Sequence, residues 1–111
     1  MALLRAWLTA FAITTSIELL VAVPLLAAGG SRARRIGAVC LAQLATHPSV
    51  WFIWPLLGLP RAQFLLVAEG FAIVVETLVY RFSFERLSWA RCLAASALAN
   101  GVSVLVGLWL R

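Results

Sequence analysis

Four long apolar segments dominate the hydrophobic pattern of the chain, and short polar or glycine-containing stretches separate them. The segments cover residues 3–28, 36–59, 62–84 and 87–110. Each one reaches the roughly 20 residues that an α-helix needs to cross the hydrocarbon core of a bilayer. A helix also satisfies its own backbone hydrogen bonds in lipid. The pattern therefore predicts an all-α fold in which residues 1–111 form a single integral membrane domain.

The connections between the predicted helices are short. Residues 29–35 read GGSRARR, and the glycine pair and the charge predict a loop there. Residues 58–61 read GLPR and predict a tight turn, with Pro60 placed to begin the next helix. Residues 81–91 are expected to form the third connection. Because short connections make neighbouring helices antiparallel, we expect a polytopic transmembrane four-helix bundle built of two helical hairpins.

The composition favours lipid rather than water as the surrounding solvent. Hydrophobic residues make up 64% of the chain, against about half in a soluble domain, and the mean hydropathy is +1.03. A cleaved signal peptide is an alternative for the first segment, because Arg5 lies near its start and small residues end it. We expect a transmembrane helix instead, because the segment is too long for a signal peptide and contains polar residues, including Glu18.

Arginine supplies all of the side-chain positive charge. The chain has nine arginines and no lysine, four glutamates and no aspartate, and a net charge of +5. The arginines lie at the ends of apolar segments and do not alternate with aromatic residues on a basic face, so we expect no nucleic-acid partner. We expect the Arg-rich loops to contact the anionic headgroups of the lipid bilayer.

The distribution of arginine also predicts an orientation. Residues 29–35 and 81–91 hold six arginines, and the opposite side holds three: Arg5, Arg61 and Arg111. The positive-inside rule then places these two loops in the cytoplasm and both termini outside, in what we expect to be a prokaryotic inner membrane. Tryptophans gather at membrane interfaces, and four of them fall toward the outer side: Trp7, Trp51, Trp54 and Trp109.

Each predicted helix carries strongly polar residues near its middle. Glu69 and Glu76 lie seven residues apart, about two helical turns, on nearly the same face. Carboxyl groups are costly in hydrocarbon, so they face the interior of a bundle or a water-filled cavity. We therefore expect one shared polar core near the bilayer midplane, with these members: Glu18, Gln43, Thr46, His47, Glu69, Glu76 and Asn100.

The predicted core favours binding or relay of a proton or cation, and hence proton- or cation-coupled transport. Neighbouring carboxyl groups repel each other as anions, so they can share one proton, and His47 can titrate near neutral pH. Alternatively, the polar groups act as hydrogen-bonded links between helices, and the chain is a non-catalytic subunit or scaffold of a larger membrane complex. A lower alternative is an intramembrane enzyme acting on a lipid-like substrate, because acids near a polar midplane can carry out proton transfer.

Two further residues flank this core. Tyr80 lies four residues after Glu76 and is expected at the membrane interface rather than bonded to that glutamate. Pro48 frees a backbone carbonyl near Leu44, which either faces the polar core or marks an ordinary helix kink.

Metal and cofactor binding have little support in the sequence. His47, Glu69 and Glu76 are weak candidate metal ligands, because imidazole and carboxylate together suit Mn, Fe or Zn. No paired ligand motif accompanies the single histidine. The two cysteines, Cys40 and Cys92, are expected to be free thiols. We expect no cofactor.

The small size of the chain bears on its assembly and on its resemblance to known proteins. A bundle of 12.0 kDa has too few helices to enclose a wide pathway alone, so we expect a homodimer or a larger membrane complex. In size, helix count and an acid in the first helix, Glu18, the chain resembles the small multidrug resistance transporters. The loop and second-helix patterns of that family are not found here, so the resemblance implies a similar architecture only.

Overall fold

A computed structural model describes residues 1–110 and contains helices but no β-strand in that range. The α-helices are α1 (Ala2–Leu25), α2 (Arg32–Phe52), α3 (Arg61–Ser83) and α4 (Trp89–Trp109). Two short 3₁₀ helices, η1 (Ala27–Gly29) and η2 (Trp54–Leu57), follow α1 and α2. Arg111, which entered the predicted charge balance, lies outside the described residues. The all-α prediction is confirmed.

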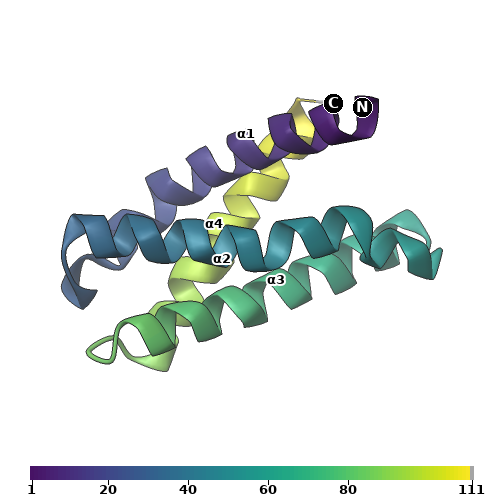
Figure 1. Cartoon of the computed structure of the whole chain (residues 1–111). Helices are drawn as coiled ribbons and strands as arrows, with labels where there is room; N and C mark the ends of the chain where they lie inside the picture. The colour runs from purple at the N-terminus through teal and green to yellow at the C-terminus, as the bar shows by residue number, and fades with distance from the viewer. Residues whose placement is uncertain (111) are drawn as a thin grey trace.

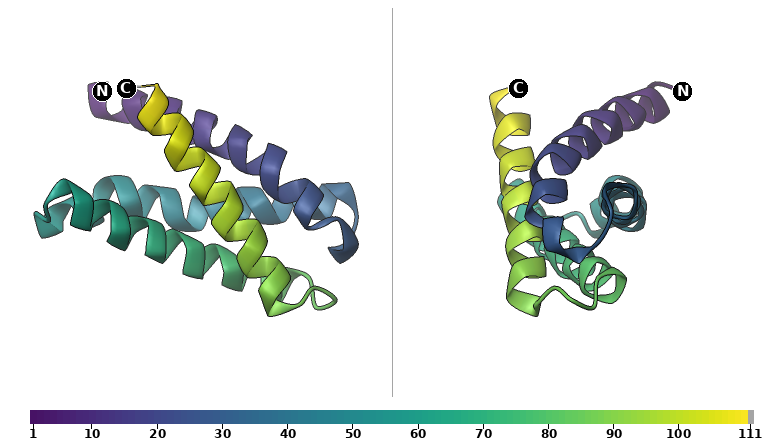
Figure 2. Two further views of the ribbon diagram at one scale, coloured as in Figure 1. Left: turned by 180° about the vertical axis from the view of Figure 1, so that it is seen from behind. Right: turned by 90° about the vertical axis from the view of Figure 1, so that its left-hand side faces the viewer.

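The four helices form a ring in which each helix packs against the next, and α4 packs back against α1 (Figure 1). Both termini and the α2–α3 connection lie at one end of the bundle, which we call the terminus end. The α1–α2 and α3–α4 connections lie at the opposite end, which we call the loop end. From their crossing point, α1 and α4 diverge toward the terminus end (Figure 2).

Two serines determine where α2 and α4 begin. The Ser31 hydroxyl accepts a hydrogen bond from the backbone N–H of Arg34, and Ser88 does the same for Arg91. Each serine satisfies a donor of the first helical turn that has no partner within the helix. As a result, α2 begins at Arg32 rather than at residue 36, and arginines that we expected in a loop form its first turn.

The second apolar segment is not one continuous helix. α2 continues through Pro48 as far as Phe52, and η2, which contains Pro55, follows as a separate 3₁₀ turn. Gly58 ends this turn in the left-handed conformation with a φ of 64°, which glycine adopts at little cost. The helix predicted over 36–59 is therefore divided, and its last residues belong to the connection with α3.

Small side chains line the helix interfaces, and large apolar side chains face outward. Leu20 and Leu66 are 78% and 76% exposed. Each α-helix, in the case of α2 together with η2, has the length and hydropathy of a membrane span. Small residues allow helices surrounded by lipid to approach closely. The buried alanines are Ala22, Ala38, Ala42, Ala68, Ala72, Ala95 and Ala99.

A compact apolar layer closes the loop end. Leu26, Phe84 and Leu87 are buried there and belong to one hydrophobic cluster. Gly29 lies directly against the Phe84 side chain: a Cβ atom added to Gly29 falls only 2.8 Å from Phe84 Cγ. This close approach of backbone to an aromatic ring requires glycine.

Arginine side chains connect the helix ends beside this apolar layer. Arg35 donates hydrogen bonds to the carbonyl oxygens of Val23 (2.8 Å) and Gly30 (3.1 Å). Arg91, from the first turn of α4, donates to the carbonyl oxygen of Leu25 (2.7 Å). Carbonyl groups in the last turn of a helix have no hydrogen-bond partner within the helix. These two arginines supply the missing donors at the end of α1.

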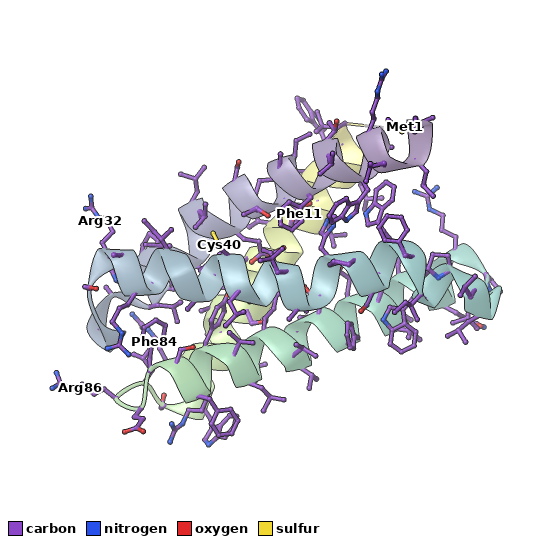
Figure 3. The ribbon with its side chains drawn as sticks, viewed as in Figure 1. Met1, Phe11, Arg32, Cys40, Phe84 and Arg86 are labelled. Atoms are coloured by element: carbon purple, nitrogen blue, oxygen red, sulfur yellow. The ribbon has the colours of Figure 1, made fainter. Side chains whose placement is uncertain are left out.

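Arg34 provides a similar link to α3. It donates to the carbonyl oxygen of Ser83 (3.1 Å), and its guanidinium lies 5.7 Å from the centroid of the Phe84 ring. By contrast, Arg32 and Arg86 project outward from the loop end (Figure 3). The arginines of this end thus divide into those that join helices and those that face the surroundings.

Candidate functional site

A cavity of about 510 Å³ lies between the four helices. It extends from the terminus end, where Leu110 lines it, to the middle of the bundle, where Glu76 and Asn100 line it. Aromatic side chains, including Trp51 and Phe64, form part of its wall. The volume falls within the range of small-molecule sites, about 300–1,000 Å³. The cavity therefore brings a carboxyl group from the bundle interior within reach of the terminus end.

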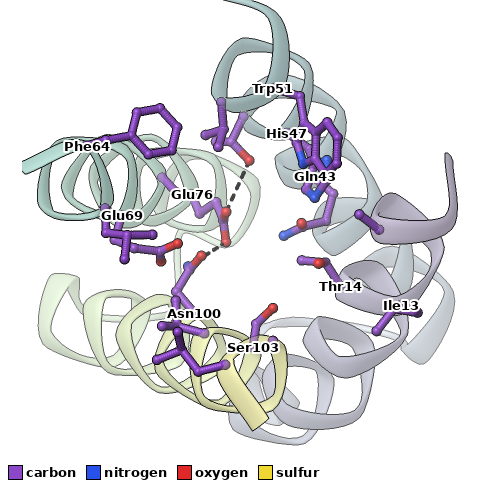
Figure 4. A pocket seen from close by; sticks show the side chains of 18 of the residues that line it. Ile13, Thr14, Gln43, His47, Trp51, Phe64, Glu69, Glu76, Asn100 and Ser103 are labelled. Atoms are coloured by element: carbon purple, nitrogen blue, oxygen red, sulfur yellow. Dashed lines mark hydrogen bonds between the residues drawn. The ribbon is translucent and has the colours of Figure 1, made fainter. Parts of the chain in front are cut away.

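Glu76, which is 1% exposed, is the most extensively bonded carboxyl group of the cavity. Its Oε1 accepts a hydrogen bond from Asn100 Nδ2 (3.0 Å), and its Oε2 lies 3.2 Å from Thr46 Oγ1 (Figure 4). Asn100 Nδ2 also donates to the Ser96 carbonyl oxygen (2.8 Å). Because a carbonyl can only accept, this second bond fixes which amide atom faces Glu76. Glu76 of α3 is thus held from both α2 and α4.

The Thr46 hydroxyl can bond Glu76 in either protonation state. It has one hydrogen but two neighbouring acceptors, Glu76 Oε2 and, at 3.0 Å, the carbonyl oxygen of Ala42. When Glu76 is ionised, Thr46 donates to the carboxylate. When Glu76 is neutral, its O–H donates to Thr46, and Thr46 donates to Ala42. The site can therefore hold or release a proton without moving a side chain.

Two further polar side chains reach the same cavity. Gln43 is 1% exposed, and its amide nitrogen has no hydrogen-bond partner. The Gln43 amide points toward Glu76 (Figure 4). Glu69 is half-buried and points into the cavity from α3, on the same side as Glu76. The inner part of the cavity therefore combines two carboxyl groups with an amide that is directed at one of them.

His47 lines the cavity, but an aromatic group holds it in place. Trp7 Nε1 donates a hydrogen bond to His47 Nδ1 (3.0 Å). An indole N–H can only donate, so Nδ1 carries no hydrogen and the neutral imidazole has its hydrogen on Nε2. Phe11 lies edge-on to the imidazole and Trp51 stacks on it. Protonation of His47 would break the bond to Trp7, so this residue is better placed to orient α1 against α2 than to exchange protons.

The role of Trp7 is the part of this arrangement that sequence reasoning missed. We assigned Trp7 to the membrane interface because of its position near one end of an apolar segment. Trp7 does lie near the terminus end, as this assignment requires. However, nothing in the sequence indicates that Trp7 bonds to His47. The pairing depends on how α1 is rotated against α2.

Glu18 is fully buried but is not among the residues that line the cavity. Neither of its carboxyl oxygens has a hydrogen-bond partner. The structure therefore brings six of the seven residues of the predicted polar core to the cavity, while Glu18 does not line it. The six members that line the cavity are Gln43, Thr46, His47, Glu69, Glu76 and Asn100.

Tyr80 also differs from expectation. We predicted an interfacial position, but the side chain is fully buried and its hydroxyl has no hydrogen-bond partner. The physical reason is that α3 continues to Ser83 and is followed by the buried Phe84, so the apolar layer of the loop end lies beyond Tyr80. The tyrosine belongs to the bundle interior.

The geometry does not support a metal site. Among residues 1–110, no three histidine, cysteine or acidic side chains come together as a metal-binding group. The weak candidates His47, Glu69 and Glu76 therefore do not form a ligand set, and the Nδ1 atom of His47 is already bonded to Trp7.

Comparisons of the chain with models of known protein families, with curated proteins and with solved structures find no match. The resemblance to the small multidrug resistance transporters is thus limited to size, helix count and Glu18. The function is inferred from the geometry of the site itself.

Proposed function

We propose that this chain is a multi-pass membrane protein that binds a proton or a small cation at Glu76, by way of the cavity, and couples this binding to transport. The observation that carries the proposal is the bonding of Glu76 by Thr46 and Asn100. A buried polar group without a partner costs about 1–3 kcal/mol. Because Thr46 can serve Glu76 as donor or as acceptor, neither protonation state incurs that cost. This is the property that a reversible proton site needs.

The exterior of the bundle supports the membrane part of the proposal. The longest dimension is 39 Å, which exceeds the roughly 30 Å of the hydrocarbon core. Leucines project outward from each of the four α-helices, and in lipid such exposure has no hydrophobic cost. Polar side chains are costly in hydrocarbon, so in lipid those of the interior are more stable when they face one another.

The proposal is tested by reconstituting the purified protein in liposomes that contain a pH-sensitive dye and measuring proton uptake. We expect Glu76→Gln to abolish uptake. Glutamine reproduces the bonds of the neutral acid, because its oxygen accepts from Asn100 and its nitrogen donates to Thr46, but it takes up no proton. The matched control is Glu85→Gln, which changes an exposed glutamate of the α3–α4 connection. Uptake that persists in Glu76→Gln contradicts the proposal.

The same liposomes distinguish a proton from a metal cation. Imposed Na⁺ or K⁺ gradients at constant pH should produce no Glu76-dependent flux if the ligand is a proton. A flux that depends on Glu76 and on one of these ions identifies that ion as the ligand instead.

A second candidate is a structural role in a larger membrane complex. It is favoured by the fact that the Glu76 bonds join three helices, α2, α3 and α4. Under this alternative, Glu76→Gln assembles like the wild type and neither protein takes up protons. Isolation of a stable complex with a different membrane protein, by purification in mild detergent, supports this role.

We also propose an orientation and an oligomeric state. Six arginines lie at or near the loop end, so we place that end in the cytoplasm of a prokaryotic inner membrane and both termini outside. We further propose that a homodimer is the working unit, because four helices surround only a narrow interior. Reporter fusions to the C-terminus test the orientation, and cross-linking in native membranes tests the dimer.

A further inference from the structure

Three buried side chains in the bundle interior carry polar atoms without a hydrogen-bond partner. These atoms are both carboxyl oxygens of Glu18, the hydroxyl of Tyr80 and the amide nitrogen of Gln43. Glu18 and Tyr80 are fully buried, and Gln43 is nearly so. Buried polar groups nearly always have a partner, so such exceptions point to a bound water molecule or ion. The three side chains belong to α1, α3 and α2, which are three of the four helices around the interior.

These side chains lie close to Glu76. Glu18 and Glu76 are each about two turns from the loop end of their helices. Tyr80 follows Glu76 by four residues, so the two side chains share a helix face. Glu18 and Glu76 are both electrostatic neighbours of the Tyr80 hydroxyl, and Glu76 is a neighbour of Glu18. Gln43 points toward the same carboxyl group (Figure 4).

Other titratable groups border this interior. α3 also contributes Glu69, whose charge acts on Glu18. α2 contributes His47, which is bonded to Trp7, and Cys40, while α4 contributes Cys92. Thiols are poor proton carriers between carboxyl groups, and Glu69 lies two turns farther toward the terminus end than Glu76. Glu76 is therefore the suitable exchange partner for Glu18.

We propose that one buried water molecule joins Glu18, Tyr80 and Gln43 and lets Glu18 exchange a proton with Glu76, which makes Glu18 an inner proton site. This inference rests on the proposed function of Glu76. Tyr80 and Gln43 donate to the water oxygen, and the water donates to Glu18. In the transfer, the Gln43 amide turns from the water to Glu76, at which it already points, and the O–H of neutral Glu76 takes its place on the water oxygen. The water then accepts this proton while it gives one of its own to the Glu18 carboxylate. Glu76 becomes a carboxylate, Glu18 becomes a neutral acid and the water is unchanged.

The donors that surround the guest favour water over a metal cation. The Gln43 amide nitrogen carries two hydrogens, and a neutral phenol keeps one on its oxygen. An N–H group directed at a metal cation is repulsive, whereas a water oxygen accepts two such hydrogens. A buried water typically has two to four polar partners, on the order of what these three side chains supply.

The test is infrared difference spectroscopy of the purified full chain in liposomes, recorded as the pH is changed. A neutral carboxyl group gives a C=O stretching band that moves to lower frequency when its carbonyl accepts a hydrogen bond. We expect Glu18→Gln to remove one pH-sensitive band and Glu76→Gln to remove another. Tyr80→Phe keeps the ring and loosens the water, so it should shift the Glu18 band to higher frequency and leave the Glu76 band in place.

The matched control is Thr77→Val, which also removes a buried hydroxyl from α3. The Thr77 hydroxyl donates to the carbonyl of Ile73 in its own helix (2.6 Å), so its loss should move neither band. Exchange into ¹⁸O-labelled water should shift an O–H band of the bound water in the wild type, and Tyr80→Phe should remove that band.

The outcomes separate this inference from the proposal on which it rests. If Glu76→Gln removes no pH-sensitive band, the proposed function fails. If Glu76→Gln removes a band but Glu18→Gln does not, or if Tyr80→Phe leaves the Glu18 band unmoved, the inner site fails alone. A Glu18 band that responds to Na⁺ or K⁺ at constant pH also overturns the inference, because the guest is then a cation.

Discussion

At the loop end, Phe84, Leu26 and Leu87 fill the space between the helices, whereas the same four helices enclose a cavity on the side of the terminus end. The loop end is also linked by arginines that bond to backbone carbonyls of neighbouring elements. Toward the terminus end, α1 and α4 diverge (Figure 2). One bundle thus combines a packed half and an open half, and Glu76 lies where the two meet. The carboxyl group of Glu76 therefore borders the cavity on one side and the packed half on the other.

The packed half is tested most directly by truncating one of its largest buried side chains. We expect Phe84→Ala to lower the free energy of unfolding by about 3 kcal/mol, because a buried aromatic ring is replaced by a cavity. Reversible denaturation in detergent micelles measures the change. Phe82→Ala is the matched control, because Phe82 is 74% exposed and its loss should cost much less. Equal losses for the two variants would show that the loop end is not a packed layer.

The close approach of Gly29 to Phe84 gives a second test. We expect Gly29→Ala to destabilise the protein by about 1–3 kcal/mol, because the added methyl group overlaps the Phe84 side chain. In Gly37→Ala the added methyl group meets no atom within 4 Å, so helix propensity should make that variant neutral or more stable by roughly 0.5–1 kcal/mol. The same denaturation assay compares them, and a neutral Gly29→Ala contradicts the tight packing.

Chemical accessibility compares the two halves in a single experiment. In a Cys40→Ala background, Ser103→Cys places a thiol in the cavity lining, while Cys92 is fully buried in the apolar cluster. We expect a small water-soluble thiol reagent to label the cavity thiol on the order of tenfold faster than Cys92, because reaction needs access. Equal labelling rates would mean that the loop end opens as readily as the terminus end.

Of these structural features, the hydrogen bonds from arginine to backbone carbonyls should contribute least to the free energy of unfolding. Arg91→Gln removes the bond to the Leu25 carbonyl, and we expect a loss of about 0.5–1 kcal/mol because the group is exposed to solvent or headgroups. Arg32→Gln is the control, because Arg32 projects outward at the same end (Figure 3). A larger loss for Arg32 than for Arg91 would contradict the assignment of these two roles.

The number and type of helices could be predicted because length and hydropathy alone decide them. Their boundaries could not be predicted with the same accuracy. Charge suggested that Arg32 and Arg34 lie in a loop, but the hydroxyl of Ser31 caps a helix that starts at once. The end of α2 shifted for a related reason: local turn chemistry around Pro55 and Gly58 outweighed the continuous apolar character of the segment.

The depth of the candidate-site residues in the bundle could be predicted from the sequence. The rotation of each helix about its own axis could not. Thr46, Glu76 and Asn100 lie at similar heights in three segments, and the structure brings them into hydrogen-bonding contact. Depth also suggested that Glu18 shares their cavity, but the rotation of α1 about its own axis decides which space its side chain enters. That rotation depends on packing with two neighbouring helices, which a single sequence does not specify. Tyr80 was misplaced because the layer formed by Phe84 beyond it was not foreseen.

The ring order of the helices has a consequence for how the protein is made. α1 packs against α2 and α4, and α4 leaves the ribosome after the other three helices. At a synthesis rate of about 5–20 residues per second, α1 waits for seconds with only one of its two neighbours in place. During that interval, one flank of the first helix, near Glu18, faces lipid or the insertion machinery. Enclosure of this glutamate therefore has to wait for α4, which is synthesised after α1, α2 and α3.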